Sequence, residues 1–240
     1  MLFSILANVS IAQPQPLVEP PFWWTGMKTD ELQLMAHGEG IARTYPRLLY
    51  PGVQMVKVSK AESMDYLFID LEIHDEALPG KFTIDFLGDE NILYSFDYEL
   101  RERKKGSSGR TGFGPEDVIY LIMPDRFSNG DESNDNLPGM LEKADRNNPD
   151  GRHGGDIKGI LDNLDYISDM GYTAVWLNPV LENNNPKYSY HGYAITDFYS
   201  LDPRIGTNAE YAGFVEKCHN NGLKVIMDMV FNHCGMGHWW

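Results

Sequence analysis

The sequence predicts an all-β, immunoglobulin-like sandwich followed by the first part of a (β/α)8 barrel. Short runs with period-2 alternation fill residues 14–100, whereas apolar strand-like runs alternate with helical patterns in residues 115–240. Between them, residues 101–114 are first basic and then rich in glycine and serine. That composition is typical of an inter-domain linker, so two domains are expected.

The N-terminal domain is predicted from three alternating runs, residues 66–73, 82–86 and 92–98. Residues two apart lie on the same face of a strand, so each run predicts a half-buried strand. Turn residues separate the runs, which indicates a small antiparallel sandwich. Trp23 and Trp24 precede them. Adjacent strand residues face opposite sides, so at least one of the two is expected in the core rather than on a sugar-stacking surface.

The C-terminal domain is predicted from strand and helix patterns that alternate along the chain. The predicted strands are residues 118–123, 174–179 and 225–231. Residues 157–167 have the apolar spacing of one helix, and Thr207 is placed to cap a second. Apolar strands that alternate with helices predict a parallel sheet.

A dinucleotide-binding sheet is the alternative to a barrel, but no G-x-G-x-x-G follows any predicted strand. A (β/α)8 barrel needs about 250 residues. Residues 117–240 therefore have room for about three of its eight strands.

The composition excludes some classes of function. A net charge of -15 argues against nucleic acid as a partner and is compatible with a neutral substrate or a bound cation. No run of about 18 apolar residues is present, so no membrane span is expected. The two cysteines, Cys218 and Cys234, form no C-x-x-C motif and are expected to be free thiols.

Residues 1–12 are similar to the end of a secretory signal, with Ser10-Ile11-Ala12 as a small-x-small cleavage site. The basic segment that begins such a signal is missing. A clipped signal predicts a periplasmic or secreted protein, and a floppy N-terminus on a cytoplasmic protein is the alternative.

Three groups of polar and aromatic residues are candidates for function. The first group, within residues 129–135 and 153–156, offers carboxylate, amide and carbonyl oxygens. Ca²⁺ prefers such oxygen ligands, although polar turns have the same composition. The second, Tyr188–Tyr199 with its aromatic rings and a histidine, suits sugar binding or plain loop packing. The third, Asp228, Asn232 and His233, follows a predicted strand at the end where α/β barrels keep their chemistry. A buried Asp228 would need a cationic or hydrogen-bond-donating partner.

These residues resemble the α-amylase family of glycoside hydrolases (family 13), and most closely its cyclomaltodextrinase and neopullulanase branch. Residues 228–233 resemble the family's first signature region, on barrel strand three. Residues 171–179 resemble its strand-two motif, and residues 119–131 resemble its first strand with the calcium loop. The match covers about residues 115–240, and the sandwich is similar to that branch's N-terminal domain.

The resemblance implies a role for each matching residue. Calcium would be bound by Asn129, Asp131, Asn134, Asp135, the carbonyl of Gly154, and Asp156. Tyr193 would stack under the sugar that is cleaved, and His191 and His233 would hydrogen-bond to its hydroxyls. Asp228, with Asn232 beside it, would be a structural carboxylate paired to an arginine near the nucleophile.

The resemblance implies an N-terminal part of a retaining hydrolase that cuts α-1,4-glucosidic bonds in cyclodextrins, pullulan or maltodextrins. Retaining hydrolysis needs two carboxyls about 5 Å apart. The family carries them on strands four and five, so this chain is expected to be inactive alone. A homodimer of the full-length enzyme is common in that branch. A non-catalytic glucan- and calcium-binding module and an unfolded fragment remain as alternatives.

Overall fold

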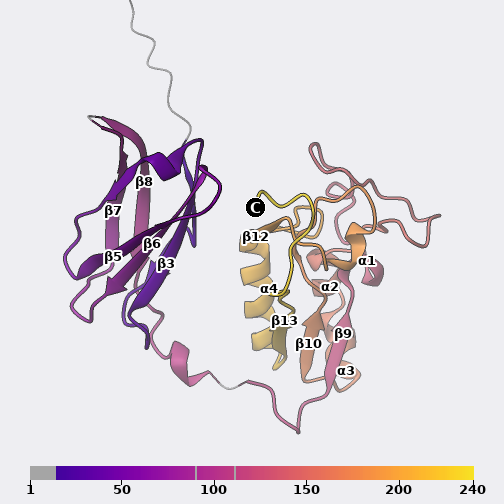
Figure 1. The fold of residues 1–240 in the computed structure, drawn as a ribbon. Coiled ribbons are helices and arrows are strands. Elements are labelled where there is room, and N and C mark those ends of the chain that lie inside the picture. Colours follow the sequence, from indigo (N-terminus) through magenta and orange to yellow (C-terminus); the bar gives the residue numbers. More distant parts are fainter. Residues whose placement is uncertain (1–14, 90, 111) are drawn as a thin grey trace, which may run out of the picture. The chain divides into compact units, whose positions relative to one another are not determined.

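The computed structural model describes residues 15–89, 91–110 and 112–240, and the chain divides into two units between Arg110 and Thr111 (Figure 1). This division falls inside the segment predicted as a linker. The predicted secretory signal, residues 1–12, lies outside the described residues.

The first unit is a sandwich of two four-stranded sheets with strand orders β1-β3-β6-β5 and β2-β8-β7-β4. All of its pairings are antiparallel except the parallel pairing of β2 with β8. Two short 3₁₀ turns, η1 (Ile41–Arg43) and η2 (Ser107–Gly109), accompany the strands. The strands are β1 (Leu17–Glu19), β2 (Phe22–Trp24), β3 (Glu31–His37), β4 (Tyr45–Arg47), β5 (Val53–Lys60), β6 (Tyr66–Ile73), β7 (Gly80–Leu87) and β8 (Ile92–Arg101).

The core of the sandwich follows the predicted alternation. Along β6 every second side chain is buried, and Leu67 and Ile69 are fully enclosed. Trp23 packs against this core, as expected for one of the two tryptophans. Ile92 does not follow the pattern, because it is 47% exposed. The register shifts between Phe86 and Leu87 on the neighbouring strand, and such an irregularity interrupts the alternation of faces.

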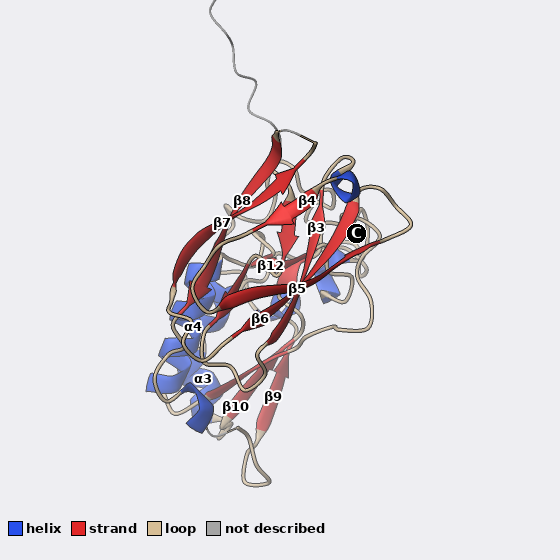
Figure 2. Ribbon diagram, turned by 60° about the vertical axis from the view of Figure 1, so that its left-hand side comes forward, coloured by secondary structure: helices blue, strands red, loops and turns tan. Residues whose placement is uncertain are grey.

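The second unit contains the parallel sheet, with strand order β13-β10-β9, and a short antiparallel pair, β11-β12. Figure 2 shows its helices in blue beside the red strands. The predicted fold, a β-sandwich followed by the start of a parallel β/α domain, is confirmed. The elements are β9 (Ile119–Ile122), α1 (Pro124–Phe127), α2 (Ile157–Leu161), α3 (Leu164–Asp169), β10 (Ala174–Leu177), β11 (Leu181–Glu182), η3 (Ser189–His191), β12 (Asp197–Leu201), α4 (Asn208–Asn220) and β13 (Lys224–Met227).

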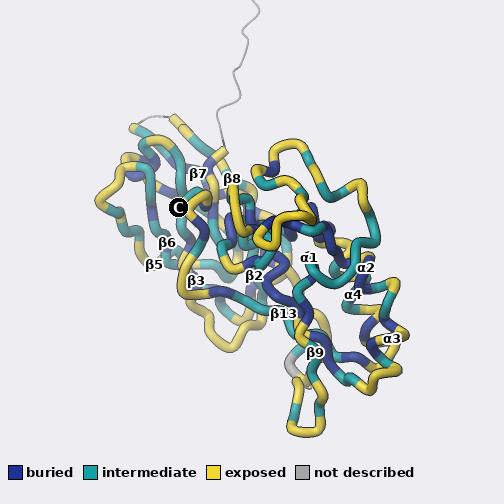
Figure 3. The backbone as a smooth tube through the Cα atoms, turned by 90° about the vertical axis from the view of Figure 1, so that its right-hand side faces the viewer, coloured by how far each residue is buried: buried dark blue, intermediate teal, exposed yellow. Residues whose placement is uncertain are grey.

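The parallel sheet has two unlike faces. One face, which includes Val175 and Leu177, packs with α2, α3 and α4 into the core that Figure 3 shows in dark blue. The opposite face carries Leu121, Trp176 and Ile226 at one level of the register. Leu121 and Trp176 are 55% and 38% exposed. In a (β/α)8 barrel this second face points to the interior, so it is the side on which ligand-binding groups are expected.

The predicted single helix over residues 157–167 is wrong, because the structure has two short helices there, α2 and α3. The break lies at Asn163, whose side-chain amide donates to the Gly159 carbonyl over 2.8 Å. Asparagine disfavours helix interiors because its side chain competes for backbone groups in this way. The prediction for Thr207 is confirmed, since it forms a capping box with Glu210 at the start of α4.

The third strand is also shorter than predicted. β13 ends at Met227, and Phe231, predicted within the strand, is 86% exposed. Met227 pairs with Leu177, the last residue of β10, and Pro179 soon follows. Since proline lacks the N–H that a ladder needs, β10 cannot pair with a longer β13. The first strand likewise covers residues 119–122 rather than 118–123.

None of the helices in the described ranges has the length and apolar character needed to cross a bilayer. Cys218 and Cys234 are free thiols, as predicted.

One carboxylate ties the amino ends of all three parallel strands together. Asp117 lies just before β9, and its Oδ2 accepts from Lys224 Nζ over 2.6 Å and from the Gly114 amide over 2.8 Å. Its Oδ1 accepts from Thr173 Oγ1, next to β10, over 2.8 Å. The Lys224 hydrogen bond is the largest of the causes that lower the pKa of Asp117 to about 2.

We predict that Asp117 makes the second unit less stable in acid. A carboxyl in an unfolded chain has a pKa of about 3.9. Because folding lowers this pKa, the contribution of Asp117 to stability is complete above that pH and is lost as the pH falls towards about 2. Asp117→Asn should flatten the dependence of urea stability on pH between these values. Asp162→Asn, which removes an exposed pair with Lys158, is the control and should leave the dependence unchanged. An unaltered dependence in Asp117→Asn would contradict the prediction.

Candidate functional site

Asp228 is the centre of a cluster at the carboxyl ends of β10 and β13. Its Oδ2 accepts from the phenol of Tyr193 over 2.9 Å and from the indole Nε1 of Trp176 over 3.2 Å. Asp228 is half-buried rather than fully buried, and its observed partners are neutral donors. Trp176 was not predicted as a site residue. Its position between the core residues Val175 and Leu177 places its side chain on the opposite face of the sheet.

Both predicted histidines contact the backbone of Tyr193. His233 Nε2 donates to the Tyr193 carbonyl over 2.8 Å, while its Nδ1 accepts from Asn232 Nδ2 over 3.0 Å. His191 Nδ1 accepts from the Tyr193 amide over 2.9 Å, so a neutral His191 carries its proton on Nε2. Burial lowers the pKa of His191, which favours this neutral form. The structure therefore brings His191, Tyr193, Asp228, Asn232 and His233 together.

The cluster has the properties of a surface for sugar hydroxyls and ring faces. Tyr193 is 39% exposed, and its ring centre lies 5.8 Å from that of His191. Burial, together with the hydrogen bond to Asp228, raises the pKa of Tyr193, so the phenol stays protonated and keeps donating to that carboxylate. An aromatic face flanked by imidazole and carboxylate groups can stack on a sugar ring and hydrogen-bond to its edge.

The six predicted calcium ligands also gather in one place, because the two ends of the long loop between α1 and α2 meet. Asn129 donates to Asp135 Oδ1 over 2.8 Å. A side chain at Gly154, which has φ 84°, would collide with Asp135 and Asn129. Asp156 caps α2 and accepts from the amides of Gly130 and Asp131 over distances of 2.8–3.2 Å.

The oxygen atoms of this cluster suit a hard cation. The side-chain oxygens of Asn129 and Asn134 are buried and have no hydrogen-bond partner in the structure. Buried polar atoms are almost always paired, so two unpaired amide oxygens in one cluster are candidates for binding a cation. Burial raises the pKa of Asp135, a penalty that a bound cation would offset. The Oδ1 atom of Asp131 already accepts hydrogen bonds from Ser133. Groups of three or more His, Cys, Asp or Glu placed to hold a metal are absent from the described part of the chain.

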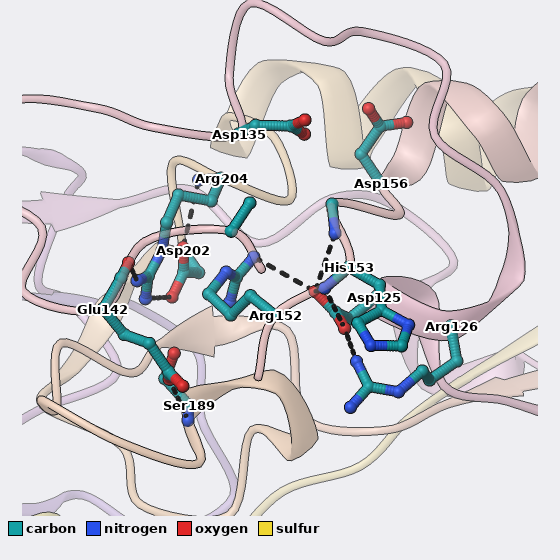
Figure 4. Close-up of polar contacts among 12 residues, drawn as sticks. Asp125, Arg126, Asp135, Glu142, Arg152, His153, Asp156, Ser189, Asp202 and Arg204 are labelled. Atoms are coloured by element: carbon teal, nitrogen blue, oxygen red, sulfur yellow. Dashed lines mark hydrogen bonds and ion pairs between the residues drawn. The ribbon is translucent and has the colours of Figure 1, made fainter. Parts of the chain in front are cut away.

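A buried charged network that the sequence analysis missed lies beside this cluster (Figure 4). Asp125 accepts from the amides of His153 and Gly154 and from the Arg126 guanidinium, so it holds the segment that presents the Gly154 carbonyl. Arg152 is 1% exposed and lies 3.8 Å from Asp125 Oδ1. Burial lowers the pKa of Arg152. Runs of mixed charge in a loop give no signal that distinguishes such a network from solvated residues.

A sandwich joined to parallel β/α units, with polar and aromatic groups at the carboxyl ends of the strands, is the arrangement of an α/β-barrel enzyme. Sequence comparison agrees. The profile of the α-amylase catalytic domain matches residues 121–240, and that of the cyclomaltodextrinase N-terminal domain matches residues 17–104. The chain belongs to the α-amylase family of glycoside hydrolases and carries a cyclomaltodextrinase-type N-terminal domain.

Individual relatives match about half of the chain. A β/α-amylase of Paenibacillus polymyxa is 48% identical over 119 residues, which cover 49% of this chain and 10% of that protein. A cyclomaltodextrinase of Thermoanaerobacter pseudethanolicus is 44% identical over 120 residues, which cover 49% of this chain and 20% of that protein. Neopullulanase 2 of Thermoactinomyces vulgaris is 40% identical over 122 residues, with coverages of 50% and 20%. The matched region thus spans 10–20% of the length of these relatives.

We predict that Gly154→Ala destabilises the second unit by roughly 3 kcal/mol in the absence of metal, because the new methyl group meets Asp135 and the backbone has φ 84°. Gly139→Ala is the matched control, since Gly139 has φ 87° but open space around it, and should cost roughly 1 kcal/mol. Urea unfolding in EDTA measures both. Equal losses would show that the close approach at Gly154 has no energetic effect.

Proposed function

We propose that this chain provides the calcium site and part of the sugar-binding surface of a retaining α-glucan hydrolase. The proposed substrates are the α-1,4-glucosidic bonds of cyclodextrins, pullulan or maltodextrins. The observation that carries the proposal is the cluster at the strand ends, in which Asp228 and two histidines hold Tyr193, a residue that is 39% exposed. The names of the cyclomaltodextrinase and neopullulanase relatives support this choice of substrates.

The chemistry of the cluster supports binding rather than cleavage by the chain alone. Retaining hydrolysis needs a nucleophilic carboxylate and a general acid about 5 Å apart. In the described cluster around Tyr193, Asp228 is the carboxylate, and its Oδ2 is occupied by two donors that come from the fold itself. The histidines position hydroxyls and cannot replace such a pair of carboxyls. The 240-residue chain is therefore expected to bind α-glucans without hydrolysing them.

We further propose that the oxygen cluster binds Ca²⁺. Asn129, Asn134, Asp135 and the Gly154 carbonyl would supply ligands, and Asp131 and Asp156 would join them once freed from their present hydrogen bonds. A bound Ca²⁺ would neutralise neighbouring carboxylates and connect the two ends of the long loop. Two unpaired buried amide oxygens support this proposal.

The sugar site can be tested by calorimetric titration with maltoheptaose and β-cyclodextrin. Tyr193→Ala should weaken binding at least about fivefold, because it removes a stacking contact that contributes about 1 kcal/mol. Tyr199→Ala is the matched control, since Tyr199 has nearly the same exposure, 40% against 39% for Tyr193, and should bind as the wild type does.

Four outcomes of that titration separate the hypotheses. Binding that needs Tyr193, without release of reducing sugar, supports the proposal. Absence of heat with both glucans would contradict the sugar site. Hydrolysis by the purified chain would contradict the expectation that it binds glucans without cleaving them. Binding that is unaffected by Tyr193→Ala would favour a separate glucan-binding module.

Calcium should raise the stability of the second unit. A free Ca²⁺ concentration 100 times the Kd adds about 2.7 kcal/mol to the free energy of unfolding. Asp135→Asn should remove most of this gain, whereas Asp169→Asn, at an exposed position of α3, should keep it. Thermal unfolding with Ca²⁺ and with EDTA measures the difference. The same melting temperature in both buffers would argue against the calcium site.

A further inference from the structure

A carboxylate distant in sequence holds the turn that carries His191. Glu142 lies in the long loop between α1 and α2, and its Oε2 accepts from the Ser189 amide over 2.6 Å. Its Oε1 accepts from the Tyr188 amide over 3.2 Å. Figure 4 shows the Glu142 side chain reaching Ser189. The two residues paired by the shorter bond are 47 positions apart, so the contact is tertiary rather than local.

The turn itself is unfavourable for its residues. Tyr188 has φ 61° and is, among the described residues, the only one other than glycine with a positive φ. Left-handed conformations of such residues persist only where the surroundings determine them fully. Gly192, with φ 83°, closes the turn against the Pro179 carbonyl, where no side chain fits. Between these two residues, Ser189–His191 form η3, which sets the direction of the His191 ring.

Glu142 is suited to hold this turn because its own backbone is fixed. The guanidinium of Arg204, which is 0% exposed, donates from Nη1 to the Glu142 carbonyl over 3.0 Å. Asp202 holds that guanidinium in turn, with contacts of 2.7 Å and 2.8 Å. A site is held most precisely when the groups that support it are locked by contacts of their own. The chain of contacts therefore runs from a buried ion pair through Glu142 to the turn.

We propose that Glu142 is a positioning residue of the sugar site, which keeps the Tyr188–Ser189 backbone in place and thereby orients His191 and Tyr193. His191 Nδ1 accepts a hydrogen bond from the Tyr193 amide, so a shift of the turn moves both side chains. The identification of these two residues as sugar-binding rests on the proposed function. Their placement by Glu142 does not depend on it.

Glu142 also acts on His191 through its charge. Burial lowers the pKa of His191, and the Glu142 carboxylate opposes this by stabilising the protonated ring. Removal of the charge should therefore lower the pKa of His191 further. A residue that only fills space would leave this titration unchanged.

Amide hydrogen exchange of the 240-residue chain tests the placement. In Glu142→Ala the Ser189 amide should exchange at least about tenfold faster, because a hydrogen bond to a charged acceptor is lost. Glu142→Gln keeps one acceptor oxygen and should give an intermediate rate. Glu216→Ala, on the exposed side of α4, is the matched control and should exchange as the wild type does. Unchanged amides of Val225 and Ile226 in β13 show that each variant is folded.

The second measurement is the NMR titration of His191 in the wild type and in Glu142→Gln, which retains the size of the side chain. The proposal expects a lower pKa of His191 in the variant. Wild-type exchange at Ser189 together with an unchanged His191 titration would overturn it. If both change but glucan binding is absent in the wild type, Glu142 positions the turn and the proposed function fails on its own.

Discussion

The parallel register of β9, β10 and β13 is the constraint on which the second unit depends. Ile122, Leu177 and Met227 lie at one level, so the segments that follow all three strands leave the sheet at the same edge. Asp228 comes directly after that level. Its carboxylate accepts hydrogen bonds from Trp176 on β10 and from Tyr193 on the loop that follows β10. One residue thus connects neighbouring strands with the candidate sugar surface.

The long loop after β9 places a second set of polar groups near the same edge. Its two ends meet at the oxygen cluster, where Asp156 accepts from amides 25 and 26 residues earlier. Its middle part supplies Glu142 to the turn before His191. Asp125 and Arg204, buried between these contacts, satisfy backbone groups of several loop segments. A loop this long and polar is held by such charged hydrogen bonds rather than by apolar packing.

The fold and the clustered site residues could be predicted because their signals are local. Period-2 runs define the strands of the sandwich, and polar groups that follow parallel strands must meet at one edge. The details that failed depend on register and side-chain contacts that a periodic pattern does not encode. β13 ends where β10 ends, Ile92 follows a register shift on β7, and Asn163 breaks a helix through its own side chain. The contacts of Trp176, which lies within the strand-two motif, and of Glu142, which belongs to no motif, have no signal in the pattern because their partners lie 52 and 47 residues away.

We propose that the groups at the strand ends form one sugar-binding surface. Two-dimensional ¹H–¹⁵N NMR of the chain during addition of maltoheptaose tests this most directly. If maltoheptaose binds there, the indole N–H of Trp176 and the amides of Tyr193 and His233 should shift together along one binding curve. Shifts confined to the strands of the sandwich, with these three signals unmoved at saturation, would contradict it.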